Sequence, residues 1–110
     1  MATVSFTSAG DTLYAYLAGE IDHDAAQQLR VSIDTTVSCR MPQQLVLDFS
    51  GVGFMDSSGI GVILGRYRVL RERGGSLGVI HMNDHVSRIF HMSGMDRVIH
   101  QLDKVQEARR

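Results

Sequence analysis

An unbroken apolar run, Leu45-Val46-Leu47, is the feature that most constrains the fold of this chain. Successive side chains of a strand point to opposite faces, so a strand without polar residues must be buried on both sides. Such strands are typical of parallel sheets, whose strands are joined by crossover helices. The run therefore predicts an α/β fold built from strand–helix–strand units.

Before this run the sequence predicts a hairpin and a helix. Thr3 to Thr7 alternates apolar and polar residues, and Leu13 to Ala18 is a second strand pattern rich in tyrosine and leucine. The short, turn-forming connection between them favours an antiparallel hairpin. Apolar residues at helical spacing then predict a helix over about 24–39, with Asp22 or Asp24 as its N-cap.

After the run the pattern again alternates between helix and strand. The predicted elements are a helix from about Ser57 to Arg73, a strand from Leu77 to Ile80, a helix starting at Asn83 or Asp84, a short strand at Val98-Ile99 and a terminal helix from Gln101 to Arg110. The buried stripe of the first of these helices is expected to comprise Ile60, Ile63, Leu64, Tyr67 and Leu70. Residues 1–110 are thus predicted to form one domain around a mixed sheet of four to five strands.

Parallel strands bring the residues that follow them to one edge of the sheet, where sites form in open α/β folds. Strands ending near Ile21, Phe49 and Ile80 are predicted to be parallel neighbours. Gly51-Val52-Gly53 is expected to be a flexible approach to this edge. The residues expected along the edge are Asp22, the turn Asp56-Ser57-Ser58, and Asn83-Asp84.

The composition limits the classes of function. With 110 residues, 44% hydrophobic and 21% charged, the chain is long enough for one modest core and is unlike disordered proteins. A formal net charge of −1 gives no reason to expect nucleic acid or an anionic membrane as a partner. Cys39 is the one cysteine, and neither a signal peptide nor a membrane span is recognisable, so a cytoplasmic location is expected.

The stretch FMDSSGIG, Phe54 to Gly61, is the one most open to a chemical interpretation. Asp56 is placed to cap the next helix, and in the simplest explanation Ser57 and Ser58 only satisfy backbone groups. Yet glycines follow, each costing about 1 kcal/mol relative to alanine inside a helix. They are Gly59, Gly61 and Gly65. The last two share a face with Ser58, which indicates either close packing or a bare strip where a partner's backbone approaches the serine.

Two other classes of site fit this stretch less well. A serine hydrolase needs an oriented base, and its nucleophile elbow needs glycine two residues before the serine, where Met55 and Asp56 stand. The spacing of Gly59, Gly61 and Gly65 superficially resembles a dinucleotide-binding loop, but these glycines fall inside the predicted helix. A small nucleotide-binding domain stays an alternative. No catalytic residue, metal ligand or cofactor is predicted, and the chain is not expected to be an enzyme.

A serine that another protein modifies explains most of the stretch. A phosphate in the first turn of a helix meets free N–H groups and the positive end of the helix dipole. It also adds about −1.5 to −2 charges to the middle of a smooth face, which would switch binding without a change of fold. Ser58 is the predicted phosphoacceptor, with Ser57 as the alternative.

The run FMDSSGIGVILGRYRVLRERGG resembles the anti-sigma factor antagonists, small STAS-domain proteins of bacterial partner switching. Gly19-Glu20-Ile21-Asp22-His23 resembles the family's segment after its second strand, and Arg88-Ile89-Phe90 and Met92-Ser93-Gly94-Met95 resemble its later helix and turn. The resemblance covers nearly the whole chain and is strongest for the sporulation branch that controls sigma-F. It implies a STAS-like mixed sheet.

The resemblance also implies a mechanism. In this family the unphosphorylated antagonist binds an anti-sigma factor, itself an ATP-dependent serine kinase, and so releases the sigma factor. The kinase phosphorylates the second serine of DSSG, which matches Ser58, and the complex is lost until a metal-dependent serine phosphatase removes the phosphate. Asp22 matches an acid beside the phosphoacceptor, although a plain helix cap explains it equally well. An antagonist of a stress-response sigma factor would use the same chemistry.

The predicted contact set follows from the strip and the resemblance together. The expected partner-binding residues are Asp22, Asp56, Ser57, Ser58, Gly59, Gly61 and Gly65. The arginines of the same helix are expected to form a solvated face. They are Arg66, Arg68, Arg71 and Arg73. The protein is expected to be a monomer that contacts neither nucleic acid nor a membrane.

Overall fold

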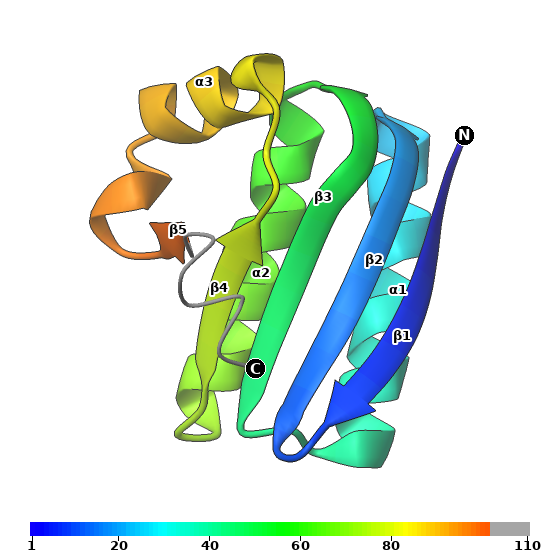
Figure 1. Cartoon of the computed structure of the whole chain (residues 1–110), viewed down its shortest axis with the longest axis vertical. Coiled ribbons are helices and arrows are strands. Elements are labelled where there is room, and N and C mark those ends of the chain that lie inside the picture. The colour runs from blue at the N-terminus through cyan, green and yellow to red at the C-terminus, as the bar shows by residue number, and fades with distance from the viewer. Residues whose placement is uncertain (102–110) are drawn as a thin grey trace.

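Five strands form a single sheet in the order β1-β2-β3-β4-β5, and helices pack against it (Figure 1). The structure, a computed structural model, describes residues 1–101. Its elements are β1 (Ala2–Ala9), β2 (Thr12–Ile21), α1 (His23–Arg40), β3 (Gln44–Met55), α2 (Ser57–Glu72), β4 (Ser76–Ile80), α3 (Asp84–Met92), the 3-10 helix η1 (Met95–Arg97) and β5 (His100–Gln101). The predicted α/β class is confirmed.

The sheet is mixed, with one antiparallel pair at its edge. β1 runs antiparallel to β2, whereas β2, β3, β4 and β5 are parallel neighbours. Sequential parallel strands joined by right-handed crossovers place their helices on the same face of the sheet. Figure 1 shows α1 and α2 together behind the sheet, with α3 beyond the end of β4. The predicted hairpin followed by strand–helix–strand units is therefore confirmed.

The apolar run that predicted this fold lies at the centre of the sheet. Leu45, Val46 and Leu47 expose 0%, 1% and 0% of their surface. The predicted stripe of α1 is buried as well; its members are Ala25, Ala26, Leu29, Ile33 and Val37. The centre of the sheet is therefore closely packed on both faces.

β3 continues to Met55 rather than ending near Phe49. Gly51-Val52-Gly53 belongs to the strand: Gly51 and Val52 pair with Ala18 and Gly19 of β2, and Gly53 lies at a shift of register. Val52 is buried, and a Cβ on Gly51 would lie 2.8 Å from the Cβ of Ala18. Glycine at position 51 thus lets two strands approach each other, and the prediction of a flexible segment is wrong.

α2 is buried along a different arc from the predicted stripe. Its buried residues are Gly59, Val62, Ile63, Arg66 and Leu70. Ile60, Leu64 and Tyr67, which were expected in the stripe, are only partly buried. The reason is that α2 packs against α1 as well as against the sheet, which turns Val62 and its neighbours inward.

The last described strand lies later in the chain than expected. Val98 and Ile99, predicted as a strand, follow η1, and both of their N–H groups donate to the carbonyl of Met95. That turn uses backbone donors that a ladder would need, so pairing begins only at His100. Gln101, expected to start a helix, ends β5, and the rest of that predicted helix lies outside the described residues.

Candidate functional site

The ends of β2 and β3 lie side by side at the carboxyl edge of the sheet. Ile21 pairs with Met55 in the register of the two strands, and the N–H of Asp56 donates to the carbonyl of Ile21 over 3.1 Å. Asp22 and Asp56 are the next residues of the two segments, and each precedes a helix. The predicted placement of Asp22 beside the DSSG turn is therefore confirmed.

Side-chain oxygens cap the helices that start at this edge. Asp22 Oδ1 accepts a hydrogen bond from the N–H of Ala25 at 2.9 Å, and Asp56 Oδ1 accepts one from the N–H of Ser58 at 2.8 Å. A carboxylate at this position also interacts favourably with the positive end of the helix dipole. Both acids thus have a structural role, and Asp22, not Asp24, caps α1.

α3 is tied to the end of β3 directly beside the two caps. The side-chain amide of Asn83 donates to the carbonyls of Val52 and Gly53, at 3.1 and 3.3 Å. The ring of His85 stacks on that of Phe54 with centroids 4.9 Å apart. The third predicted part of the edge is therefore present, held by contacts to β3 beyond the end of its pairing with β4.

Ser58 lines a hollow between the first turns of α1 and α2. The hollow has a volume of about 200 Å³ and is lined by His23, Ala26, Gln27, Arg30, Ser58, Gly61 and Val62. Its polar side chains from α1 are exposed, and Ser58 is half-buried. Ser58 therefore lines a hollow whose α1 wall carries polar side chains, among them that of Arg30.

Ser57 lines a different hollow, between α2 and α3. This second hollow has a volume of about 310 Å³ and is lined by Ser57, Ile60, Ile89, Met92 and Ser93. Met92 exposes 80% of its surface, so the wall is accessible as well as largely apolar. Ser57 and Ser58 thus line two different hollows, whose other side chains differ in chemistry.

The three glycines of α2 do not share one role. A Cβ at Gly59 would clash with the side chain of Met55, which is fully buried. A Cβ at Gly61 or Gly65 would meet nothing within 4 Å. The bare strip that the sequence suggested therefore consists of Gly61 and Gly65, while Gly59 allows close packing in the core.

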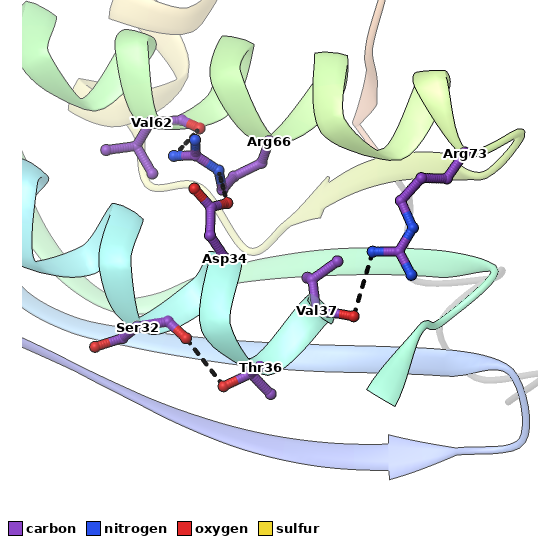
Figure 2. A network of polar contacts seen from close by, with 7 residues as sticks. All are labelled: Ser32, Asp34, Thr36, Val37, Val62, Arg66 and Arg73. Carbon is purple, nitrogen blue, oxygen red and sulfur yellow. Dashed lines mark hydrogen bonds and ion pairs between the residues drawn. The ribbon is translucent and has the colours of Figure 1, made fainter. Parts of the chain in front are cut away.

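Two turns further along, charged side chains close the interface between α1 and α2 (Figure 2). Arg66 Nε lies 2.7 Å from Asp34 Oδ1, and Arg66 also donates to the carbonyl of Val62 at 3.4 Å. Although Arg66 Nε and Asp34 Oδ1 lie close together, their angles do not meet the geometry of a hydrogen bond. The contact between them is therefore mainly electrostatic. Arg73 donates to the carbonyl of Val37 at 3.3 Å.

The prediction of a solvated arginine face is wrong for Arg66, which exposes 6% of its surface. Burial lowers the pKa of its guanidinium below the ordinary value; the carboxylate of Asp34 opposes that effect, and the charge of Arg30 adds to it. The other arginines of α2 are exposed as predicted. Arg30, which lines the hollow, is thus close enough for its charge to act on the guanidinium of Arg66.

Among residues 1–101, no hydrogen bond joins the hydroxyl of Ser58 to a possible general base. His23 lines the same hollow, but its Nε2 contacts the amide of Gln27, at 3.4 Å. A nucleophilic serine needs a base within hydrogen-bond reach that a third group orients. Across the described residues no three His, Cys, Asp or Glu side chains gather closely enough to hold a metal ion, and no helix is both long and apolar enough to cross a membrane.

Sequence reasoning missed the α1 side of the hollow. His23, Gln27 and Arg30 recur at i, i+4 and i+7, so they form a polar stripe beside the apolar stripe of α1. That spacing alone does not show which element the stripe faces. The available signal was the topology, because two successive crossovers on one face put α1 and α2 side by side, starting from one edge.

Comparison with known proteins agrees with this fold. Residues 4–108 match the sequence profile of the STAS domain. An anti-sigma F factor antagonist from Paenibacillus polymyxa is 38% identical over 87 residues, which is 79% of this chain and 74% of that protein. The sequence relationship therefore extends over most of both chains.

Solved structures extend the likeness to three dimensions. The anti-sigma factor antagonist SpoIIAA in its unphosphorylated form matches with a TM-score of 0.81 and 27% identity, covering 96% of this chain and 93% of that one. The Bacillus cell fate determinant SpoIIAA in its phosphorylated form matches with a TM-score of 0.74 and 27% identity, covering 98% of each. The chain belongs to the STAS domain family.

Proposed function

We propose that this protein is an anti-sigma factor antagonist of the sporulation sigma-F type. In its unphosphorylated form it binds an anti-sigma factor that is also a serine kinase, and the sigma factor is released. Phosphorylation of Ser58 ends the complex, and a metal-dependent serine phosphatase restores it. The protein acts as a cytoplasmic monomer and has no catalytic residue of its own.

The observation that carries this proposal is the setting of Ser58. The hydroxyl lines the groove between α1 and α2, and the neighbouring positions Gly61 and Gly65 have open space where a side chain would be. A partner's backbone can approach such a strip closely. A phosphate placed there adds about −1.5 to −2 charges to the docking surface, which opposes binding through repulsion and desolvation.

The proposed docking face combines two kinds of surface around the start of α2. One is the bare strip with the caps Asp22 and Asp56; the other is the apolar hollow beside Ser57, with exposed Met92. Large apolar side chains at the centre of an interface and polar groups at its rim are typical of specific complexes. The relatives named anti-sigma F factor antagonists support an anti-sigma factor as the partner.

The choice of Ser58 over Ser57 rests on its match to the family motif and is not a matter of exposure. Ser57 is the more exposed of the two, so accessibility alone would favour it. A phosphate on either would lie on the proposed docking face, but in hollows of different chemistry. The phosphoacceptor must therefore be located by experiment.

The test is the intact mass of the protein after incubation with its candidate anti-sigma kinase and ATP. We expect a gain of one phosphate, placed on Ser58 by peptide mapping, retained in Ser57→Ala and lost in Ser58→Ala. Ser57→Ala is the matched control, because it removes the neighbouring hydroxyl from the same turn. Absence of any gain, with the kinase active on another antagonist, would overturn the phosphorylation switch.

A binding measurement separates the complex from its switch. Unphosphorylated protein should bind the anti-sigma factor in calorimetry, and Ser58→Asp should weaken that binding by at least about tenfold, because a negative charge is introduced at the docking face. Ser58→Asn keeps a similar size without the charge and serves as the control. Equal affinities of the Asp and Asn variants would show that charge at position 58 does not act as the switch.

A further inference from the structure

One wall of the Ser58 hollow carries a cationic side chain. Arg30 of α1 is exposed and lines the hollow together with Ser58. Within residues 1–101, no hydrogen bond or ion pair engages its guanidinium group. Arg66, by contrast, is paired with Asp34. Arg30 thus lines a space that several water molecules of about 30 Å³ each would fill.

The helix geometry directs Arg30 towards Ser58. α1 and α2 follow parallel strands and start at the same edge, and the contact between Asp34 and Arg66 fixes how far one is shifted along the other. Arg30 lies one turn closer to the edge than Asp34, between that ion pair and Ser58. Side chains of a helix tilt towards its N-terminus, which for Arg30 is the direction of Ser58.

Two carboxylates lie at the same edge as Ser58, and the N–H of Ser58 already donates to one of them. The carboxylate of Asp56 already accepts the N–H of Ser58, at 2.8 Å, and Asp22 lies on the same edge. A phosphate on Ser58 would be repelled by these carboxylates and could not take that N–H without displacing the cap. The expectation that a phosphate simply binds the free N–H groups of the first turn does not hold at this donor.

We propose that Arg30 holds the phosphate of phosphorylated Ser58 within the same molecule, in the hollow between α1 and α2. The guanidinium fork supplies two donors in the geometry that phosphate oxygens accept. Gln27 and His23, which line the same wall, are placed to supply further donors. This inference rests on the proposed function only in that Ser58 must carry a phosphate.

The arrangement changes how the modification acts on binding. A phosphate seated in the hollow occupies the groove and draws Arg30 across it, while the ion pair between Asp34 and Arg66 holds the two helices in place. The partner then meets an occupied groove as well as added charge. The fold need not change, because the hollow already exists without the phosphate.

The test measures the second ionisation of the phosphate by ³¹P NMR in full-length protein with phosphoserine installed at position 58 during translation. An ordinary phosphoserine has a second pKa of about 6. A guanidinium contact stabilises the dianion, so Arg30→Gln should raise this pKa by about one unit relative to the unsubstituted protein. Arg30→Lys, which keeps the charge without the fork, should lie between the two.

Arg68→Gln is the matched control, because it removes the same charge from an exposed position of α2 that lies about 15 Å from Ser58 along the helix axis. It should shift the pKa by less than a third as much as Arg30→Gln. An equal shift in both variants, or no shift in Arg30→Gln with the protein folded by circular dichroism, would overturn the proposal. Installed phosphoserine needs no kinase, so failure of the kinase assay above leaves this measurement intact, and the two proposals fail independently.

Discussion

The two ends of the interface between α1 and α2 differ, although the same pair of helices forms both. Near the carboxyl edge the helices leave a hollow at Ser58, beside the bare position Gly61. Two turns further on, Arg66 and Asp34 close the space between them (Figure 2). The end near Ser58 leaves a hollow between the helices, whereas the end at Arg66 holds the two helices together.

The difference shows how a small domain can keep an open binding groove. An open groove gains little from packing of its walls against each other, so contacts elsewhere must set the distance between them. Here the buried ion pair and the stripe around Ile33 do so from the closed end. Substitutions at the two ends should therefore have unlike effects on the free energy of unfolding.

The largest expected effect comes from Arg66→Ala at the closed end. Removing one partner of a buried pair costs about 3–5 kcal/mol, but the side chain of Asp34 is 43% exposed and water compensates part of its charge. We expect a loss of roughly 2–4 kcal/mol in the free energy of unfolding, measured by urea denaturation. Arg68→Ala, on the exposed side of α2, should change it by less than about 0.5 kcal/mol. Similar losses in both variants would contradict a closed end held by Arg66.

Gly59→Ala should be the next most harmful. Its Cβ would clash with the buried side chain of Met55, which must move within a packed core. Overpacking of this kind costs roughly 1–3 kcal/mol. Thermal unfolding should show a lower Tm, and Gly59→Ala combined with Met55→Ala should lower it by less than the sum of the two single substitutions, because Met55→Ala already makes room for the added Cβ. A Tm at or above that of the unsubstituted protein would show that Gly59 is not needed for packing.

Gly61→Ala should have the opposite sign, although it lies only two residues away. Nothing lies within 4 Å of the position its Cβ would take, so the substitution mainly removes the entropic cost of a helical glycine. We expect a gain of about 0.5–1 kcal/mol in stability and weaker binding to the anti-sigma factor in calorimetry. A gain in stability with unchanged affinity would remove Gly61 from the docking surface.

The sequence was informative where a pattern reports on one element. Leu45-Val46-Leu47 predicted the central strand, and the spacing of Leu29, Ile33 and Val37 predicted the buried face of α1, because burial of each depends on local periodicity. The carboxyl edge was predictable as well, since parallel strands bring Asp22 and Asp56 together whatever the side chains between them.

The sequence was least informative where two elements meet. The inward turn of Arg66 depends on a carboxylate at position 34, on another helix, and no periodicity within α2 reveals it. The strand character of Gly51-Val52-Gly53 likewise depends on close approach to Ala18 of β2, whereas glycine taken by itself indicates flexibility. Arg30 was missed for the same reason, because its relation to Ser58 exists only across the helix pair.

The smallest expected effect on stability is that of Asp22→Asn. This substitution separates the role of Asp22 as a helix cap from the role of its charge. Asparagine caps a helix about as well as aspartate, so the hydrogen bond to the N–H of Ala25 should persist and stability should change by less than about 0.5 kcal/mol. Asp22→Ala removes that bond and should cost about 1 kcal/mol.

The rate of phosphorylation should follow the cap, because the carboxylate is engaged in it. We expect the kinase to phosphorylate the Asn variant at a rate within twofold of the unsubstituted protein. The Ala variant should be phosphorylated more slowly, because the start of α1 loosens beside Ser58. Initial rates from intact mass, measured beside urea denaturation of each variant, distinguish the cap from the charge. A stable Asn variant that is phosphorylated several-fold more slowly would contradict this expectation. It would show that the negative charge of Asp22 acts on the phosphorylation of Ser58 in addition to capping α1.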